Sequence, residues 1–345
     1  MPDAKSDLAL ERVAVAKSRI QSILDRDTVC NQKTLEQKIA EQGPKPMRVD
    51  PHLVGLALLD LLQLNRLSSH THESTKIAWF ANPGTKAALV AERLAELAPL
   101  YAQITGNGFG NLTGDALELV VWKCLEEQFS AKRRFAYQGH FDLTKPKKNG
   151  RYSRVAPSKT LNGKTTTGEA DFYQFGYDEG ALFIECKNYR EWFYPHQSLI
   201  KELIIKADAL DAIPVLIVRR LHYTTRTNFL EPAGIIAHES LLQYYPADQA
   251  ALAEQVKHAR KLGFTDVTAT EQPHARTRKF FSQLLPTLVP RMAANWFANR
   301  SALVAYAKDE LNLAQLYTEI GSPAGGKWEE KSAAENSSAL DDPPF

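Results

Sequence analysis

The sequence has few cysteines, no long apolar run and almost no net charge, and the first two features each exclude a class of protein. Its 3 cysteines, Cys30, Cys124 and Cys186, are far apart and form no CxxC pair, which excludes a disulfide framework and a thiolate zinc site and indicates a reducing compartment. No run approaches the ~18 apolar residues of a membrane helix, and the first residues contain no apolar signal core. We therefore predict a cytoplasmic protein with no membrane partner. The formal net charge of +2 is uninformative as a total, so the distribution of charge along the chain has to be considered.

The length and composition of the chain allow two domains with substantial cores. Its 345 residues are 44% hydrophobic, 24% charged and 9% aromatic, as in ordinary globular proteins. The glycine-rich segment TGNGFGNLTG is interpreted as a linker between domains. Changes of pattern predict an N-terminal helical domain over 1–104, a second domain over 105–250, a C-terminal helical region over 251–320 and a disordered tail over 321–345.

The first domain has the order helix, helix, hairpin. Helical periodicity covers 5–26 and 34–41, and a third helix begins after Asp50-Pro51, where Asp can cap a helix and Pro suits its first position. A polar turn and the short β-like run KIAWFANPG follow.

This order resembles that of winged-helix domains over about residues 30–95, with the wing near 66–80. The resemblance implies DNA binding, with basic residues such as Arg66 and Lys76 touching phosphates. A module for binding another protein is the alternative.

From residue 113 the pattern becomes that of an α/β domain with a mixed sheet covered by helices. The segment TGDALELVVWKCLEEQF is an amphipathic helix whose buried stripe contains Leu117, Val120, Val121, Cys124 and Leu125. After it we expect a strand in FAYQGHFDL, two strands joined at YDEG, a helix at about 196–212, and strands in IPVLIVRR and GIIAH.

The run GALFIECKNYREW carries charged residues within an apolar strand. Because alternate side chains of a strand share a face, Glu185 and Lys187 point to one side and Cys186 to the other. If the two strands pair through YDEG, Asp171 comes close to Glu185, and Glu118 of the amphipathic helix can cover the same sheet end. Carboxylates that converge in this way repel one another unless a cation lies between them, and their hard oxygens suit Mg²⁺ or Mn²⁺.

These residues and their order resemble the PD-(D/E)XK nuclease superfamily, in particular its Mrr-like and Holliday-junction-resolvase-like branch. The resemblance covers about residues 108–240 and is carried by GDALELVVWKCLEEQF, EADFYQF, ALFIECKNYREW, PVLIVRR and GIIAH. It implies a restriction-endonuclease-like mixed sheet flanked by helices, and a metal-dependent endonuclease that hydrolyses DNA, in restriction, phage defence or DNA repair. It implies that Asp171, Glu185 and Glu118 bind the metal with the backbone carbonyl of Cys186, and that Lys187 acts on the attacking water.

Further candidates lie around these residues. Gln197 is a candidate for the glutamine that this branch often carries on the next helix. The segment 145–164 contains seven Lys or Arg residues and no acid, which favours contact with the DNA backbone, although a solvated loop would have the same composition. Its basic residues are Lys145, Lys147, Lys148, Arg151, Arg154, Lys159 and Lys164.

Other interpretations remain open. Glu185 and Lys187 alone are compatible with a surface ion pair worth less than about 1 kcal/mol. A catalytically silent DNA-binding or partner-recruiting protein on a nuclease fold is one alternative function, and a ribonuclease is another. The helical region 251–320 could supply a homodimer interface or bind a partner protein.

Overall fold

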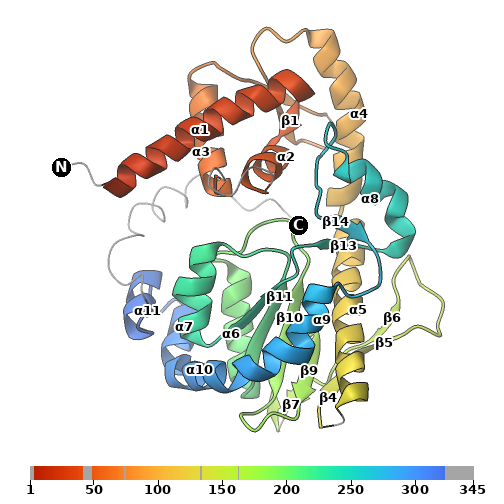
Figure 1. Cartoon of the computed structure of the whole chain (residues 1–345), viewed down its shortest axis with the longest axis vertical. Helices are drawn as coiled ribbons and strands as arrows, with labels where there is room; N and C mark the ends of the chain where they lie inside the picture. Colours follow the sequence, from red (N-terminus) through yellow and green to blue (C-terminus); the bar gives the residue numbers. More distant parts are fainter. Residues whose placement is uncertain (1–3, 42–48, 74, 133, 162, 323–345) are drawn as a thin grey trace. The chain divides into compact units, whose positions relative to one another are not determined.

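The computed structural model describes residues 4–41, 49–73, 75–132, 134–161 and 163–322 (Figure 1). The chain forms two compact units: unit 1 contains Met1–Gly110 and Asp248–Ala269, and unit 2 contains Asn111–Ala247 and Thr270–Phe345. The predicted tail, 321–345, lies outside the described residues except for its first two. In the part of the chain that the structure describes, no helix has the length and apolarity needed to cross a membrane.

Unit 1 combines helices with a three-stranded antiparallel sheet in the order β1-β3-β2. Its core is formed by apolar side chains of α1 and α3, among them Ile20, Val54 and Leu61, together with Phe80 of the sheet. Its elements are α1 (Ala4–Asp27), β1 (Cys30–Asn31), α2 (Gln32–Glu36), a π-helical turn (Gln37–Glu41), α3 (Pro51–Gln63), β2 (Ser68–Thr71), β3 (Ala78–Ala81), α4 (Ala87–Thr105), α8 (Ala250–Lys257) and β14 (Val267–Ala269).

The C-terminal region that the sequence analysis treated as one piece is divided between the units. Residues 248–269 belong to unit 1, where Lys38 Nζ donates a hydrogen bond to the Lys261 carbonyl at 3.2 Å. The helices that follow residue 270 belong to unit 2. Helical periodicity alone does not reveal this division, because it shows which face of a helix is buried but not what covers it.

The boundary between the units falls at Gly110–Asn111, inside the predicted segment TGNGFGNLTG, but this segment is helical rather than an irregular linker. After Gly106 caps α4 in an extended conformation, α5 (Asn107–Ala131) includes the remaining glycines of the segment. A glycine in a helix costs about 1 kcal/mol relative to alanine, which apolar packing can offset. The buried side chain of Phe109 provides such packing within the glycine-rich part.

Unit 2 contains a five-stranded mixed sheet in the order β12-β11-β10-β9-β4, so the predicted mixed α/β class is confirmed. β10, β11 and β12 are parallel, whereas β9 and β4 are antiparallel to their neighbours. The elements of unit 2 up to β11 are α5, β4 (Ala136–Gln138), β5 (His140–Asp142), β6 (Ser153–Val155), β7 (Thr160–Leu161), β8 (Lys164–Thr165), β9 (Phe172–Phe175), β10 (Leu182–Lys187), α6 (Ser198–Leu210) and β11 (Ile213–Val218). After these come α7 (Glu231–Ala233), β12 (Ile236–Glu239), β13 (Gln243–Tyr245), α9 (Ala275–Lys279), α10 (Leu285–Ala307) and α11 (Leu313–Glu319).

Helices cover this sheet, and Figure 1 shows α5 along one side of it and α6 along the other. The stripe predicted for α5 is confirmed, because Leu117, Val120 and Val121 are fully buried in the same core as the strands. From α6, Ile200 and Ile204 are equally buried. At about 1.5–3 kcal/mol for each large apolar side chain, this burial holds the sheet and its helices together.

Two predicted segments have a finer structure than expected. The strand predicted in FAYQGHFDL is divided into β4 and β5 at Gly139, whose φ is +93°. A Cβ at this position would lie 2.6 Å from the Asp171 carbonyl oxygen, so glycine permits the close approach of the Asp171 backbone. The basic segment 145–164, predicted as a loop, contributes strands to two hairpins, β5–β6 and β7–β8.

Candidate active site

The β9–β10 hairpin brings the first two predicted acids together. Its register pairs Phe172 with Ile184, and the amide of Asp171, directly before β9, donates to the Ile184 carbonyl at 3.2 Å, so Asp171 lies beside β10. The backbone amide of Cys186 donates to Asp171 Oδ2 at 2.6 Å. The antiparallel pairing predicted from YDEG is therefore confirmed, and one carboxylate oxygen of Asp171 is held by the backbone of β10.

Glu118 of α5 joins this pair through Arg154 of β6. The guanidinium of Arg154 lies 2.9 Å from Glu118 Oε2 and 3.1 Å from Asp171 Oδ1. It also donates to the main-chain carbonyls of Ala170 and Asp171 at 3.1 and 3.2 Å. Arg154, which the sequence placed among the DNA-contacting residues of a loop, thus lies between two of the acids.

Glu185 is flanked by two lysines on one of its oxygens. Lys187 Nζ lies 2.7 Å from Glu185 Oε1, and Lys206 Nζ of α6 lies 3.9 Å from the same atom. Lys206 is not among the residues that the sequence indicates. Its signal was weak: it is a charged residue beside the buried stripe of an amphipathic helix, and only the tertiary fold shows that this flank faces the acids.

Burial and nearby charges shift the pKa values of Glu118, Glu185 and Lys187. Glu118, Asp171 and Glu185 are 6–8% exposed. Burial, followed by the charge of Asp171, raises the pKa of Glu118 to about 8, and the same two causes raise the pKa of Glu185. Burial alone would lower the pKa of Lys187, but the charges of Glu185 and Asp171 outweigh it and raise that pKa, so the ammonium stays protonated at neutral pH.

The carboxylates fit a hard divalent cation. Glu185 Oε2 is buried and has no hydrogen-bond partner among the described residues. The Arg154 guanidinium lies 2.9 Å from Glu118 Oε2, which is also buried, but the angle between the two groups does not allow a hydrogen bond. Buried carboxylate oxygens without donors are costly, and Mg²⁺ and Mn²⁺ bind such oxygens. Arg154 competes for the same oxygens, since its charge already lies between Glu118 and Asp171.

Cys186 contributes its backbone rather than its thiol. The side chain is 4% exposed, and burial, with the charges of Asp171 and Glu118, raises the pKa of the thiol well above its usual value. A buried, protonated thiol is a poor nucleophile. Participation of the Cys186 carbonyl in metal binding stays a prediction.

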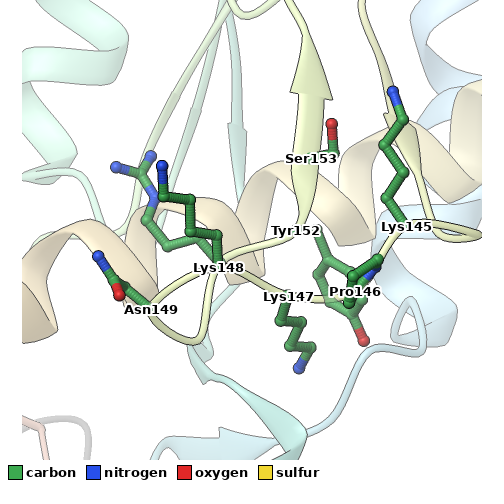
Figure 2. Close-up of a pocket in the computed structure, with 8 residues that line it drawn as sticks. Lys145, Pro146, Lys147, Lys148, Asn149, Tyr152 and Ser153 are labelled. Atoms are coloured by element: carbon green, nitrogen blue, oxygen red, sulfur yellow. The ribbon is translucent and has the colours of Figure 1, made fainter.

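The basic segment surrounds an open hollow of about 760 Å³ lined by 145–149 and 151–153 (Figure 2). Lys147 lies over the Tyr152 ring at 4.2 Å and 3.7 Å from Glu271, while Arg151 makes two hydrogen bonds with Asp115. Acidic residues also pair with Lys145 (Asp142, 3.2 Å), Lys159 (Glu169, 3.6 Å) and Lys164 (Asp211, 3.0 Å). Among the described residues of unit 2, Lys148 has no such acidic partner, so much of the positive charge of this surface is already neutralised.

The remaining candidates lie elsewhere in their units. Gln197 is the N-cap residue of α6, and its Oε1 accepts a hydrogen bond from the Tyr194 amide at 3.1 Å, so its side chain is used in the turn before the helix. Arg66 precedes β2 and Lys76 precedes β3, and both side chains are exposed on unit 1.

Comparison of this chain with protein-family models, with curated proteins and with solved structures finds no match. The chemistry of the site therefore has to be inferred from its own residues.

Proposed function

We propose that unit 2 is a divalent-metal-dependent endonuclease that hydrolyses DNA phosphodiester bonds. The observation that carries this proposal is the convergence of Asp171, Glu185 and Glu118 with Lys187, in which the buried Glu185 Oε2 has no hydrogen-bond partner among the described residues. Carboxylates whose pKa values are raised by burial and by a neighbouring charge, as those of Glu118 and Glu185 are, cluster at catalytic sites.

Each residue of the cluster has a role in this chemistry. Asp171, Glu185 and Glu118 would hold Mg²⁺ or Mn²⁺, which when bound polarises a phosphoryl oxygen and lowers the pKa of a coordinated water. The Cys186 amide orients Asp171 through its 2.6 Å hydrogen bond. Lys187 is protonated at neutral pH, so it donates hydrogen bonds to the water or to the phosphate oxygens and stabilises the charge that develops there.

We further propose that unit 1 binds DNA as a winged helix. Support comes from its element order α1, β1, α2, α3, β2, β3 and from its antiparallel sheet order β1-β3-β2. Arg66 and Lys76, at the two ends of the segment that contains β2, would contact phosphates, and the basic hairpins of unit 2 would add further contacts.

A catalytically silent DNA-binding or partner-recruiting protein is the second candidate, and Arg154 is the observation that favours it. Together Arg154, Lys187 and Lys206 bring as many positive charges to the cluster as the three acids bring negative ones. A cluster neutralised in this way has no electrostatic need for a metal ion.

A nuclease assay separates the two candidates. The purified protein is incubated with linear, supercoiled, branched and single-stranded DNA and with RNA, each with Mg²⁺, Mn²⁺ or EDTA. We expect metal-dependent cleavage of at least one DNA, and a loss of at least about 10²–10³-fold in Glu185→Gln and Lys187→Met with DNA binding retained. Asp178→Asn, in the turn of the same hairpin, is the matched control and should cleave normally.

Undiminished cleavage by both Glu185→Gln and Lys187→Met would refute the site assignment. Absence of cleavage by the wild-type protein on every DNA, while it still binds DNA, would favour the silent candidate. Cleavage of RNA alone would change the substrate class.

A further inference from the structure

The end of the Lys206 side chain packs against Gly168, in the segment that precedes β9. A Cβ on Gly168 would lie 2.4 Å from Lys206 Cε and 3.2 Å from its Nζ. The first separation is far below van der Waals contact, so a side chain at residue 168 would displace the end of Lys206 from its position.

The ammonium of Lys206 has hydrogen-bonding capacity to spare. It donates to the Glu169 carbonyl at 3.3 Å, and its 3.9 Å separation from Glu185 Oε1 is too long for a hydrogen bond. An ammonium has three N–H donors, and within the described part of unit 2 no other hydrogen bond to this group is formed. Its side chain is 20% exposed, so solvent and ligands can reach it.

The negative charge of Glu185 does not explain why Lys206 lies close to it. Lys187 already contacts the same carboxylate oxygen at 2.7 Å, so Lys206 is a second positive charge on one oxygen atom. A surplus cation close to a metal ligand weakens metal binding unless another anion approaches. The anion that the proposed reaction brings to this position is the phosphodiester itself.

We propose that Lys206 is a phosphate-binding residue that donates hydrogen bonds to an oxygen of the DNA backbone at the active site; this inference rests on the proposed nuclease function. Lys187 remains the lysine closest to the carboxylate, and Lys206 supplies a second cation on the side of α6. Charge-assisted hydrogen bonds of this kind are roughly twice as strong as neutral ones, so the contact contributes to substrate affinity and to cleavage.

Two variants test this role by different routes. Lys206→Met removes the charge, whereas Gly168→Ala retains the charge but forces the end of the lysine away from its position. Lys201→Met is the matched control, because Lys201 lies on the same helix, has a similar exposure of 24%, and pairs with Asp309 instead of the acids. DNA binding is measured in EDTA over a series of salt concentrations, and cleavage is measured with Mg²⁺.

We expect Lys206→Met to lower the slope of log affinity against log salt by about one phosphate contact, and to slow cleavage by about 10- to 100-fold. Gly168→Ala should change both quantities in the same direction, and Lys201→Met should change neither. Wild-type slope and rate in both Lys206→Met and Gly168→Ala would overturn the inference.

If Lys206→Met does not fold, Gly168→Ala alone decides, because it leaves the composition of charges intact. Failure of the proposed function gives a different result: the wild-type protein would then cleave no nucleic acid with either metal, whatever the variants do to binding.

Discussion

Two buried groups of charged residues, one in each unit, differ in how completely they are satisfied. In unit 1 Asp27 is 2% exposed; both of its oxygens accept hydrogen bonds from Arg26 at 2.8 Å, and Oδ2 also accepts one from Lys38 at 2.7 Å. Burial alone would raise the pKa of Asp27, but the hydrogen bonds from Arg26 and Lys38 outweigh it and lower that pKa. In unit 2 the pKa values of Glu118 and Glu185 are raised instead.

If unit 2 has the proposed function, this difference separates charges that stabilise a fold from charges that serve a reaction. One carboxylate with two cations is satisfied without a ligand. Three carboxylates at one sheet end repel one another, and Glu185 Oε2 keeps no hydrogen-bond partner among the described residues. Natural proteins retain such an arrangement at functional sites, where a ligand completes it.

The largest effect on stability is expected from the Asp27 group. Lys38→Met removes a buried charge-assisted hydrogen bond but leaves Asp27 paired with Arg26, so it should lower the free energy of unfolding of unit 1 by about 1.5–3 kcal/mol. Denaturant titration measures this loss. Cleavage per folded molecule should be unchanged, and a loss below about 1 kcal/mol would show that the two groups do not differ as described.

The raised pKa of Glu118 should make the free energy of unfolding fall as pH rises, whereas an acid whose pKa is lowered by folding makes it rise. The pKa of Glu118 is about 8 in the folded protein and 4.5 as a free side chain, so the folded state binds more protons between these values. The contribution of protonated Glu118 to the free energy of unfolding is therefore complete below pH 4.5 and is lost as pH rises through 8. It falls by at most about 1.4 kcal/mol per pH unit. Calorimetry between pH 5 and 8.5 should show this decline in the wild type and a flatter profile in Glu118→Gln; equal profiles would contradict it.

Arg154→Gln removes a cation from the cluster of Glu118, Asp171 and Glu185. The guanidinium that lies between Glu118 and Asp171 would no longer compete with a metal ion, so the affinity for Mn²⁺ should increase. Isothermal titration measures the affinity directly. Weaker Mn²⁺ binding would mean that Arg154 orients the acids rather than competing for them.

The smallest effect is expected for Lys148, which lies between β5 and β6, and it concerns the affinity for DNA. Lys148 has no acidic partner among the described residues of unit 2, whereas Arg151 is held by Asp115. Lys148→Ala should therefore lower the salt dependence of DNA binding by about one phosphate contact, and Arg151→Ala by less. Filter binding over a salt series compares the two, and equal decreases would show that Asp115 does not restrain Arg151.

Patterns within single elements could be read from the sequence, but contacts between distant segments could not. The alternation in LFIECK and the turn YDEG predicted the β9–β10 hairpin, and the apolar stripe of α5 predicted its buried face. Arg154 and Lys206 enter the cluster from β6 and α6, and no local pattern states which flank of those elements meets the acids.

The helical structure of TGNGFGNLTG was not predicted, for a related reason. Glycine lowers local helix propensity, but α5 forms through that segment and Phe109 within it is buried. Local preference is a weak predictor wherever long-range packing opposes it.

Titration of the metal-free protein with Mn²⁺ tests the central claim most directly, because it asks whether the crowded carboxylates form a metal site. Binding to the wild type and to Asp178→Asn should be measurable, and it should be weaker by at least about tenfold in Glu185→Gln. Equal Mn²⁺ affinity in the wild type and Glu185→Gln, or no binding to either, would contradict the account.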